Sequence, residues 1–195
     1  EAQGYIAPAD CVEVRVTLTD HERLLYATAE PEDRYRLAAT TETKTKVIEA
    51  LAARHVDDQL LVIGQYLDQL AELGERLDVP VITGEVPVKE RERLFDAFRT
   101  GEITTLVVSK VANFSVDLPE ASVAIQISGS FGSRQEEAQR LGRLLRPKHD
   151  GRTARFYAVV SRDTLDQDYA AHRQRFLAEQ GYAYRIIDAD DVLAG

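Results

Sequence analysis

The sequence contains very little cysteine and histidine, and this scarcity excludes several classes of protein. The chain of 195 residues has one cysteine, Cys11, so no disulfide can form within it. Four scattered histidines and one cysteine do not provide the ligand cluster of a structural zinc site, and no metal site is predicted. The composition therefore fits a reducing cytoplasm and a fold that is held together by its hydrophobic core.

Long apolar runs and methionine are also missing. No stretch approaches the roughly 20 apolar residues that a spanning helix needs, and no basic-then-apolar leader follows Glu1, so a membrane role is not predicted. Methionine is absent even at position 1, and the beginning resembles a cut through a longer protein. We expect residues 1–57 to be an N-terminal extension or linker. It would hold a half-exposed strand at 12–18, where valines alternate with polar residues, and helical stretches from Asp20 and Lys44.

The net charge of −9 does not favour nucleic-acid binding as an average, but the charges are unevenly distributed. Residues 134–155 hold seven basic side chains and three acidic ones, so an acidic protein has one locally cationic stretch. Composition alone favours the simpler interpretation, which is a solvated charged face.

From Asp58 onward, short apolar or β-branched runs alternate with amphipathic stretches of helical period. Strands are predicted at 59–63, 79–82, 103–108, 122–127, 155–160 and 182–187, and helices at 65–77, 88–99, 134–145 and 165–180. Near-continuous apolar strands suit a parallel sheet that is covered on both faces. The sequence therefore predicts an α/β domain over 58–195, with a mainly parallel wound sheet flanked by helices on both faces.

The helix predicted at 134–145 has clear boundaries and an unusual composition. Ser133 and Glu136 have the spacing of a capping box, and Pro147 ends the helix. A glycine inside it, Gly142, costs roughly 1 kcal/mol relative to alanine, which indicates that something packs closely there. Arg143 and Arg146 are one turn apart on one stripe, an arrangement that suits a cluster of phosphate oxygens.

Three strings in this order resemble motifs IV, V and VI of superfamily 2 helicases: 62–66, then Ser109-Lys110-Val111 with 115–119, then Gln139-Arg140-x-Gly142-Arg143-x-x-Arg146. Within that superfamily the chain resembles the C-terminal, RecA-like domain of the XPB (xeroderma pigmentosum group B) family, on the strings 109–111, 125–128 and 132–143. Glutamine rather than histidine at 139 supports this assignment over a DEAD-box RNA helicase. Ser115 stands where most relatives carry glycine.

The resemblance implies the second motor domain of an ATP-driven 3′–5′ DNA helicase or translocase of nucleotide excision repair, which in eukaryotes also serves transcription initiation. Such a protein would be cytoplasmic and nucleoid-associated in a prokaryote and nuclear in a eukaryote. The resemblance makes Arg143 and Arg146 arginine fingers, with Gln139 orienting the water or coupling the γ-phosphate to the other domain. It places Asp117 near the nucleotide ribose and Arg140 at the contact between domains. A loop cap is the alternative for Asp117.

The DNA backbone contacts that this family implies would come from the ends of strands: Gly64, Gln65, Thr83, Gly84, Ser109 and Lys110. Ordinary turn chemistry is the alternative for each of them.

A phosphate-binding Walker A loop and an acidic Walker B are absent from the sequence, and Lys44 to Lys46 lack the required glycines, so we interpret them as a helix start. ATP and Mg²⁺ would be held mainly by an upstream RecA-like domain, and the chain alone is expected to be inactive. Two alternatives stay open. One is a docking module that recruits a repair nuclease or another repair factor through the helix at 165–180 and the terminal strand, and the other is the nucleotide-binding α/β domain of a transferase.

Overall fold

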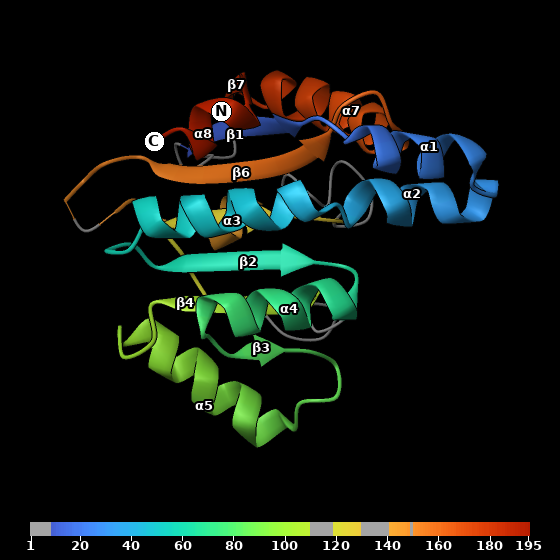
Figure 1. The fold of residues 1–195 in the computed structure, drawn as a ribbon. Helices are drawn as coiled ribbons and strands as arrows, with labels where there is room; N and C mark the ends of the chain where they lie inside the picture. Colours follow the sequence, from blue (N-terminus) through green and yellow to red (C-terminus); the bar gives the residue numbers. More distant parts are fainter. Residues whose placement is uncertain (1–8, 110–118, 130–140, 149) are drawn as a thin grey trace.

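The computed structural model describes residues 9–109, 119–129, 141–148 and 150–195, and in them the chain forms a wound α/β sheet (Figure 1). Its strands have the order β3-β4-β2-β5-β6-β1-β7, and each pair of neighbours runs parallel. The strands are β1 (Ala9–Val16), β2 (Leu60–Gly64), β3 (Val81–Ile82), β4 (Thr105–Ser109), β5 (Val123–Gln126), β6 (Ala154–Ser161) and β7 (Ala183–Asp188). The predicted fold class is confirmed.

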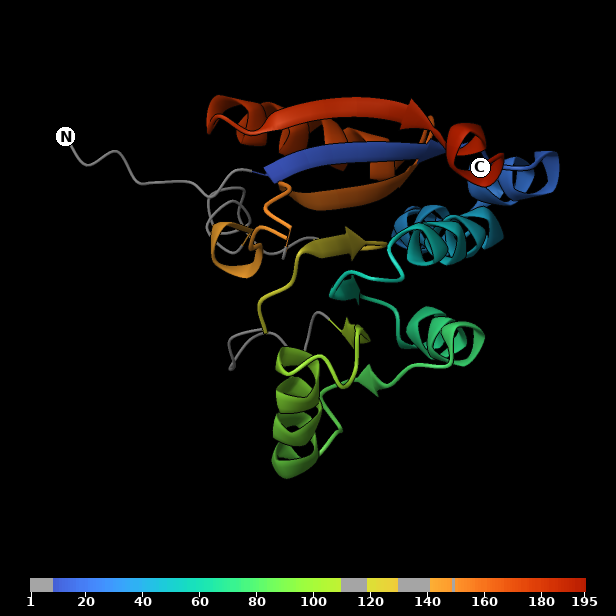
Figure 2. The same cartoon turned by 90° about the vertical axis from the view of Figure 1, so that its left-hand side faces the viewer.

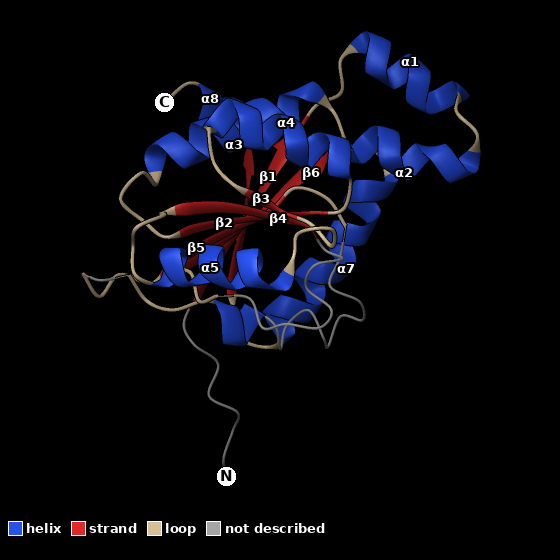
Figure 3. Cartoon of the chain, turned by 90° about the horizontal axis from the view of Figure 1, so that it is seen from below, coloured by secondary structure: helices blue, strands red, loops and turns tan. Residues whose placement is uncertain are grey.

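Helices cover both faces of the sheet (Figure 2). One apolar core packs α3 (Glu42–Arg54), α4 (Leu67–Leu77) and α8 (Ala189–Leu193) against the sheet. The other packs α5 (Val88–Arg99), the helical residues 141–144 and α7 (Leu165–Glu179). The remaining pair, α1 (Asp20–Thr28) and α2 (Pro31–Ala39), extends beyond the carboxyl ends of the strands (Figure 3). Among the described helices, none is long and apolar enough to cross a membrane.

The first strand differs from its prediction. We expected 12–18 to be half-exposed, but β1 lies between β6 and β7, and its side chains are buried on both faces. Glu13 is fully buried because it has polar partners: it accepts hydrogen bonds from the Tyr184 hydroxyl at 2.6 Å and from Arg15 Nε at 2.7 Å. Alternation of apolar and polar residues therefore did not mark a solvent-facing side. Residues 9–54, expected as an extension or linker, contribute β1 and α1 to α3 to this fold.

Candidate functional site

The carboxyl edge of the sheet brings together some of the residues predicted to contact DNA. Gly64 and Ser109 are partners in the β2–β4 register, so they lie side by side where these strands end. Both residues are buried, whereas Gln65, the next residue after β2, is exposed. Gln65 therefore presents a side chain to solvent at this edge, next in the chain to the buried pair Gly64 and Ser109.

Gly64 has a packing reason to be glycine. A Cβ atom at this position would lie 2.7 Å from Leu70 Cδ2 and 2.9 Å from Ile127 Cγ2, closer than side-chain carbons normally approach. Its small size lets the chain after β5 lie close to the end of β2. A contact between the backbone of Gly64 and a phosphate stays a prediction.

Thr83 and Gly84 follow β3 in a turn. The Thr83 hydroxyl accepts a hydrogen bond from Glu85 N at 3.3 Å, and its carbonyl accepts one from Val86 N at 3.2 Å. Thr83 is half-buried and Gly84 is exposed. These bonds are the turn chemistry that the alternative interpretation expected, and the DNA role of both residues stays a prediction.

A network of hydrogen bonds surrounds the chain just after β5. Ser128 Oγ accepts a hydrogen bond from Gln65 N at 2.9 Å and donates one to Gln69 Oε1 at 3.1 Å. Gly129 N donates to the Tyr35 hydroxyl at 2.7 Å, and Gln69 Nε2 donates to the carbonyl of Ala39 at 2.8 Å. The network therefore ties the segment after β5 to the turn after β2, to α2 and to α4.

Lys44 anchors the same segment from α3. Its side chain is fully buried; Nζ lies 2.7 Å from the carbonyl oxygen of Ile127 and 2.7 Å from Asp166 Oδ2. Burial lowers the pKa of Lys44, while the charge of Asp166 and its hydrogen bond oppose that shift. Asp166 is itself buried and accepts a second hydrogen bond from Ser161 N at 2.9 Å.

The sequence predicts Lys44 only as part of a helix start. The missed signal is spacing, because Lys44, Val47, Ile48 and Leu51 fall at i, i+3, i+4 and i+7 on the buried face of α3. A lysine on such a face must find partners inside the protein.

The arginine-bearing helix is anchored by its leucines. Leu141, Leu144 and Leu145 are buried in the core beneath the sheet, and Arg143 is exposed. A Cβ on Gly142 would meet the Tyr182 hydroxyl at 3.5 Å, which is an ordinary contact. The close packing expected at Gly142 is therefore not found among the described residues.

Arg146 lies beyond the last helical residue, Leu144, so it does not continue the predicted stripe with Arg143. Its NH2 group pairs with Glu120 Oε1 at 3.0 Å, and its NH1 group donates to the carbonyl of Leu145 at 3.0 Å. Its backbone N–H bonds the carbonyl of Ala121 at 2.9 Å, which fixes it beside the amino end of β5.

The residues predicted to contact DNA therefore lie at the carboxyl ends of the strands, and Arg146 lies near their amino ends. Ser122 to Ser128 spans six strand-like steps, or roughly 20 Å, between the edge near Arg146 and the edge with Gln65. Four predicted site residues, Lys110, Asp117, Gln139 and Arg140, lie outside the described residues.

The family model of the ERCC3/RAD25/XPB C-terminal helicase matches residues 1–194. The chain belongs to this family. It is 75% identical to the DNA 3′-5′ helicase XPB of Kineococcus radiotolerans, and the match covers the whole of this chain and 35% of that protein. It is 70% identical to the protein of the same name from Mycobacterium tuberculosis, and that match covers 99% of this chain and 35% of the relative. The chain thus spans about a third of the length of these relatives.

Solved structures support the fold of this XPB domain. S. cerevisiae Dbp5 bound to RNA and ADP BeF3 matches with a TM-score of 0.66 at 17% identity, covering 96% of this chain and 43% of that one. The Sulfolobus solfataricus SWI2/SNF2 ATPase C-terminal domain matches with a TM-score of 0.59 at 15% identity, covering 89% and 87%. The sheet is that of a RecA-like helicase C-terminal domain.

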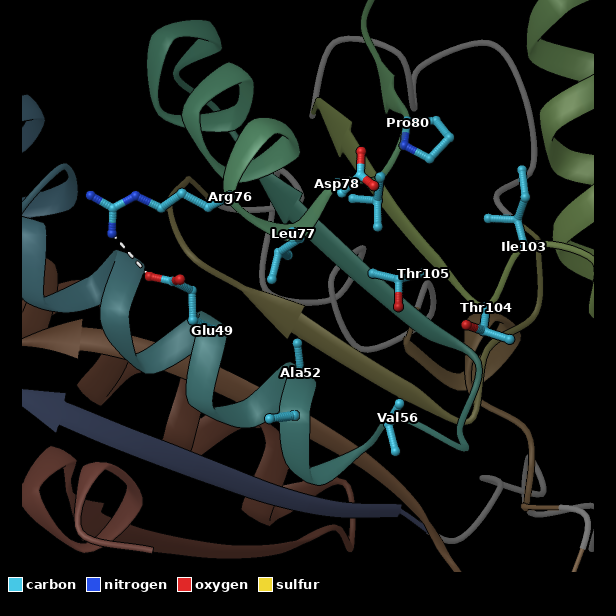
Figure 4. Close-up of a pocket in the computed structure, with 12 residues that line it drawn as sticks. Glu49, Ala52, Val56, Arg76, Leu77, Asp78, Pro80, Ile103, Thr104 and Thr105 are labelled. Atoms are coloured by element: carbon cyan, nitrogen blue, oxygen red, sulfur yellow. Dashed lines mark hydrogen bonds and ion pairs between the residues drawn. The ribbon is translucent and has the colours of Figure 1, made fainter.

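Two hollows lie at the amino edge of this XPB domain, away from the predicted DNA residues. One, of about 620 Å³, opens between the carboxyl ends of α3 and α4; Arg76 and Glu49 form an ion pair beside it at 2.9 Å (Figure 4). The other, of about 450 Å³, is lined by His55, Asp58 and Lys148, among others. Neither hollow contains a residue that the sequence marked as functional.

A buried histidine beside the second hollow forms a hydrogen-bonded cluster. His55 Nδ1 lies 2.7 Å from Asp58 Oδ2, and Nε2 lies 2.7 Å from the Tyr157 hydroxyl. Lys148 Nζ pairs with the same Asp58 oxygen at 3.1 Å. Burial lowers the pKa of His55 in spite of its hydrogen bond to Asp58. This cluster joins the end of α3 to β6 and to the chain after the arginine-bearing helix.

Proposed function

We propose that this chain is the second motor domain of an ATP-dependent 3′–5′ DNA helicase or translocase that acts in DNA repair. The observation that carries the proposal is the family match over residues 1–194, together with 75% identity to a protein named DNA 3′-5′ helicase XPB. ATP and Mg²⁺ would be held mainly by an upstream RecA-like domain, and the nucleotide would bind between the two domains.

In this proposal the chain supplies charge that stabilises the transition state, because guanidinium groups offset the negative charge on the transferring phosphoryl group. Arg143 suits the role because it is exposed beside two buried leucines, Leu141 and Leu144, that fix its helix. Arg146 is held by Glu120, but both side chains are about half-exposed, so the pair contributes little and can open when the domains close. Gln139 would orient the attacking water or couple the γ-phosphate to the other domain. Asp117 and Arg140 would complete the nucleotide and interdomain contacts.

DNA would bind at the carboxyl edge through its backbone, without base readout. The exposed side chain of Gln65 supports this, as does its place beside Gly64 and Ser109 at the ends of two parallel strands. Thr83, Gly84 and Lys110 would extend the contact along the same edge.

The test of the proposed function is Arg143→Ala in the full-length protein. ATP binding should persist, while turnover should fall by about 10³ or more, as for removal of other arginine fingers. Arg175→Ala is the matched control, because Arg175 is a highly exposed arginine on α7, and it should leave turnover unchanged. Normal turnover in Arg143→Ala would exclude the finger role.

The alternative of a docking module relied on the helix at 165–180. In the structure α7 packs on the sheet through Ala170, Arg173 and Leu177, which is a sufficient reason for its pattern. A repair nuclease or other repair factor as a partner stays a prediction. Capture of such a partner by the chain without ATP or DNA, unaffected by Arg143→Ala, would support it.

A further inference from the structure

We propose that Tyr66 and Tyr169 form a stacking platform for an unpaired base of single-stranded DNA at the carboxyl edge of the sheet. The inference rests on the proposed function and deepens it, because it adds contacts to bases and names a single strand as the bound form of DNA. It depends on three tyrosines that come from three separate segments of the chain and lie together.

The three tyrosine rings meet at the carboxyl edge. The ring centroid of Tyr35, in α2, lies 6.3 Å from that of Tyr66 and 5.3 Å from that of Tyr169. Tyr66 directly precedes α4 and Tyr169 lies in the second turn of α7, and these two helices begin just after β2 and β6 end. Because the strands are parallel, both helices begin at the same edge (Figure 1). Tyr66 also follows Gln65, the exposed residue predicted to contact DNA.

Tyr35 is the fixed member of this cluster. Its hydroxyl accepts a hydrogen bond from Gly129 N at 2.7 Å, which holds the ring at the turn after β5. Tyr66 and Tyr169 pack against this ring, and the contact limits the rotamers that they can adopt. An aromatic surface that is ordered in advance loses little conformational entropy when a base stacks on it.

The fold does not require the Tyr169 ring for packing. The buried residues of α7 are Asp166, Ala170, Arg173 and Leu177. Tyr169 lies outside this set and is 51% exposed. Tyr66 is half-buried, and although it is the N-cap residue of α4, its side chain makes no capping hydrogen bond. Both rings therefore present aromatic surface at the edge where DNA is proposed to bind.

An arginine beside the rings supplies the charge that a DNA strand requires. The guanidinium of Arg36 lies over the Tyr66 ring, with Cζ 5.0 Å from the ring centroid. Its ion pair with Asp68 is long, at 3.5 Å, and both side chains are well exposed, so the pair contributes little. Arg36 can therefore pair with a phosphate while a base stacks on the tyrosines. Proteins that bind single strands without sequence preference combine aromatic rings and positive charge in this way.

Stacking on a protein ring selects an unpaired strand. In a duplex each base is covered on both faces by its neighbours, so a ring can stack on it only after the base has left the helix. Every base has a π-face, so such a platform does not distinguish one sequence from another. The platform therefore predicts that this edge engages a strand of DNA after the duplex has opened.

The experiment measures the Kd of the full-length protein for three probes: a single-stranded oligonucleotide, the same strand with abasic sites in place of its bases, and a duplex. Tyr66→Leu and Tyr169→Leu keep an apolar side chain and remove the ring. Each should weaken binding of the intact single strand by roughly 5- to 150-fold. Binding of the abasic strand and of the duplex should not change. Tyr66→Phe and Tyr169→Phe keep the ring and should bind all three probes as the parent does.

Phe176→Leu is the matched control. Phe176 comes seven residues after Tyr169 in α7, so the two rings share one stripe of the helix and lie two turns, or roughly 10 Å, apart. Phe176 is half-buried, as Tyr66 is, but it lies away from the carboxyl edge. Its replacement should leave the Kd for the intact single strand unchanged.

An equal loss of affinity for the abasic strand would overturn the inference, because the rings would then act through the fold. An equal loss in Phe176→Leu, or unchanged binding of the single strand in both tyrosine-to-leucine variants, would overturn it too. A parent protein that binds the duplex but not the single strand would have the same consequence. If Tyr66→Leu fails to fold, Tyr169→Leu decides the matter, since its ring is outside the packed face of α7.

The proposed function has its own test. Unchanged turnover in Arg143→Ala would defeat the role proposed there for the chain, whatever the tyrosine variants show. Loss of turnover in Arg143→Ala, together with normal binding of the single strand in Tyr66→Leu and Tyr169→Leu, would defeat only the stacking platform.

Discussion

The buried ion pair between Lys44 and Asp166 gives the sharpest test of how this domain is held together. Lys44→Met keeps most of the length of the side chain and removes its charge and its hydrogen bonds. Asp166 is 5% exposed, so its carboxylate would lose its cation without gaining water. Removing one partner of a buried pair costs roughly 3–5 kcal/mol, a large part of the 5–15 kcal/mol that stabilises a typical domain.

The assay is urea unfolding of the 195-residue chain, with a double-mutant cycle over Lys44→Met and Asp166→Asn. Asp166→Asn keeps an oxygen acceptor for Ser161 N, which donates to Asp166 at 2.9 Å, and removes the charge. The double variant should be more stable than the sum of the two single losses predicts, by roughly 0.5–3 kcal/mol. In it, neither charge is left unpaired.

Arg93→Met is the comparison, because Arg93 pairs with Glu90 at 2.7 Å but both side chains are exposed. It should produce no resolvable change in the same titration. Strictly additive losses in the Lys44 and Asp166 cycle, or a Lys44→Met variant as stable as the parent, would refute the reasoning. Either result would mean that the pair is solvated.

Two further predictions concern stability. Gly64→Ala should destabilise the chain by roughly 1–3 kcal/mol, because the new Cβ atom would lie 2.7 Å from Leu70 Cδ2. Gly142→Ala should be neutral or stabilising by up to about 1 kcal/mol. A thermal unfolding series in which Gly64→Ala is the more stable of the two variants would contradict this prediction. The pKa of His55 is lowered by burial, so the unfolded chain binds its proton more readily, and the free energy of unfolding should fall as the pH drops below 6.5 toward the lowered folded value. His55→Gln should flatten that dependence between pH 5 and 7 in urea titrations, and an equal slope in both proteins would exclude His55 as the cause.

The sheet could be predicted from the sequence because its inner strands are marked by short apolar runs, which can be recognised locally. The run at 59–63 is apolar without interruption, and the observed β2 is buried at every residue from Leu60 to Gly64. The strand predicted at 79–82 was longer than the observed β3, Val81–Ile82, whose two residues are the ones in register with β4. The ends of a strand depend on which residues of the neighbouring strand pair with it, and the local sequence pattern does not indicate those residues.

The burial of charged residues could not be predicted in this way. Glu13 is buried because the Tyr184 hydroxyl reaches it from β7, and these two residues are 171 positions apart. The spacing of Lys44 with Val47 and Leu51 does indicate a buried face, but its partners Ile127 and Asp166 come from the other half of the chain. A helical wheel identifies a side chain that needs partners, and only the fold identifies those partners.

In the candidate site too, the sequence indicates which residues are present but not where the fold places their side chains. The stripe of Arg143 and Arg146 predicted two guanidinium groups aimed at one point, which requires the helix to continue through both. The helix ends at Leu144, and Arg146 turns to Glu120 beside β5. Pro147 correctly indicated an end, but hydrogen bonding of Arg146 N to Ala121 ends the helix earlier than the proline requires.

This early end has a consequence for how the fingers would work. With Arg146 held at the amino edge and Arg143 exposed, the two groups can converge on a phosphate only if the exposed pair with Glu120 opens, which costs little. The backbone bond between Arg146 and Ala121 is different, because it belongs to the main chain beside a fully buried strand. Convergence should therefore come from rotation of the Arg146 side chain while its backbone stays on β5. Glu120→Gln, which removes the charge that holds Arg146, should then leave the fold intact and raise the affinity of the full-length protein for an ATP analogue. Weaker binding of the analogue would show that Glu120 aims Arg146 instead of restraining it.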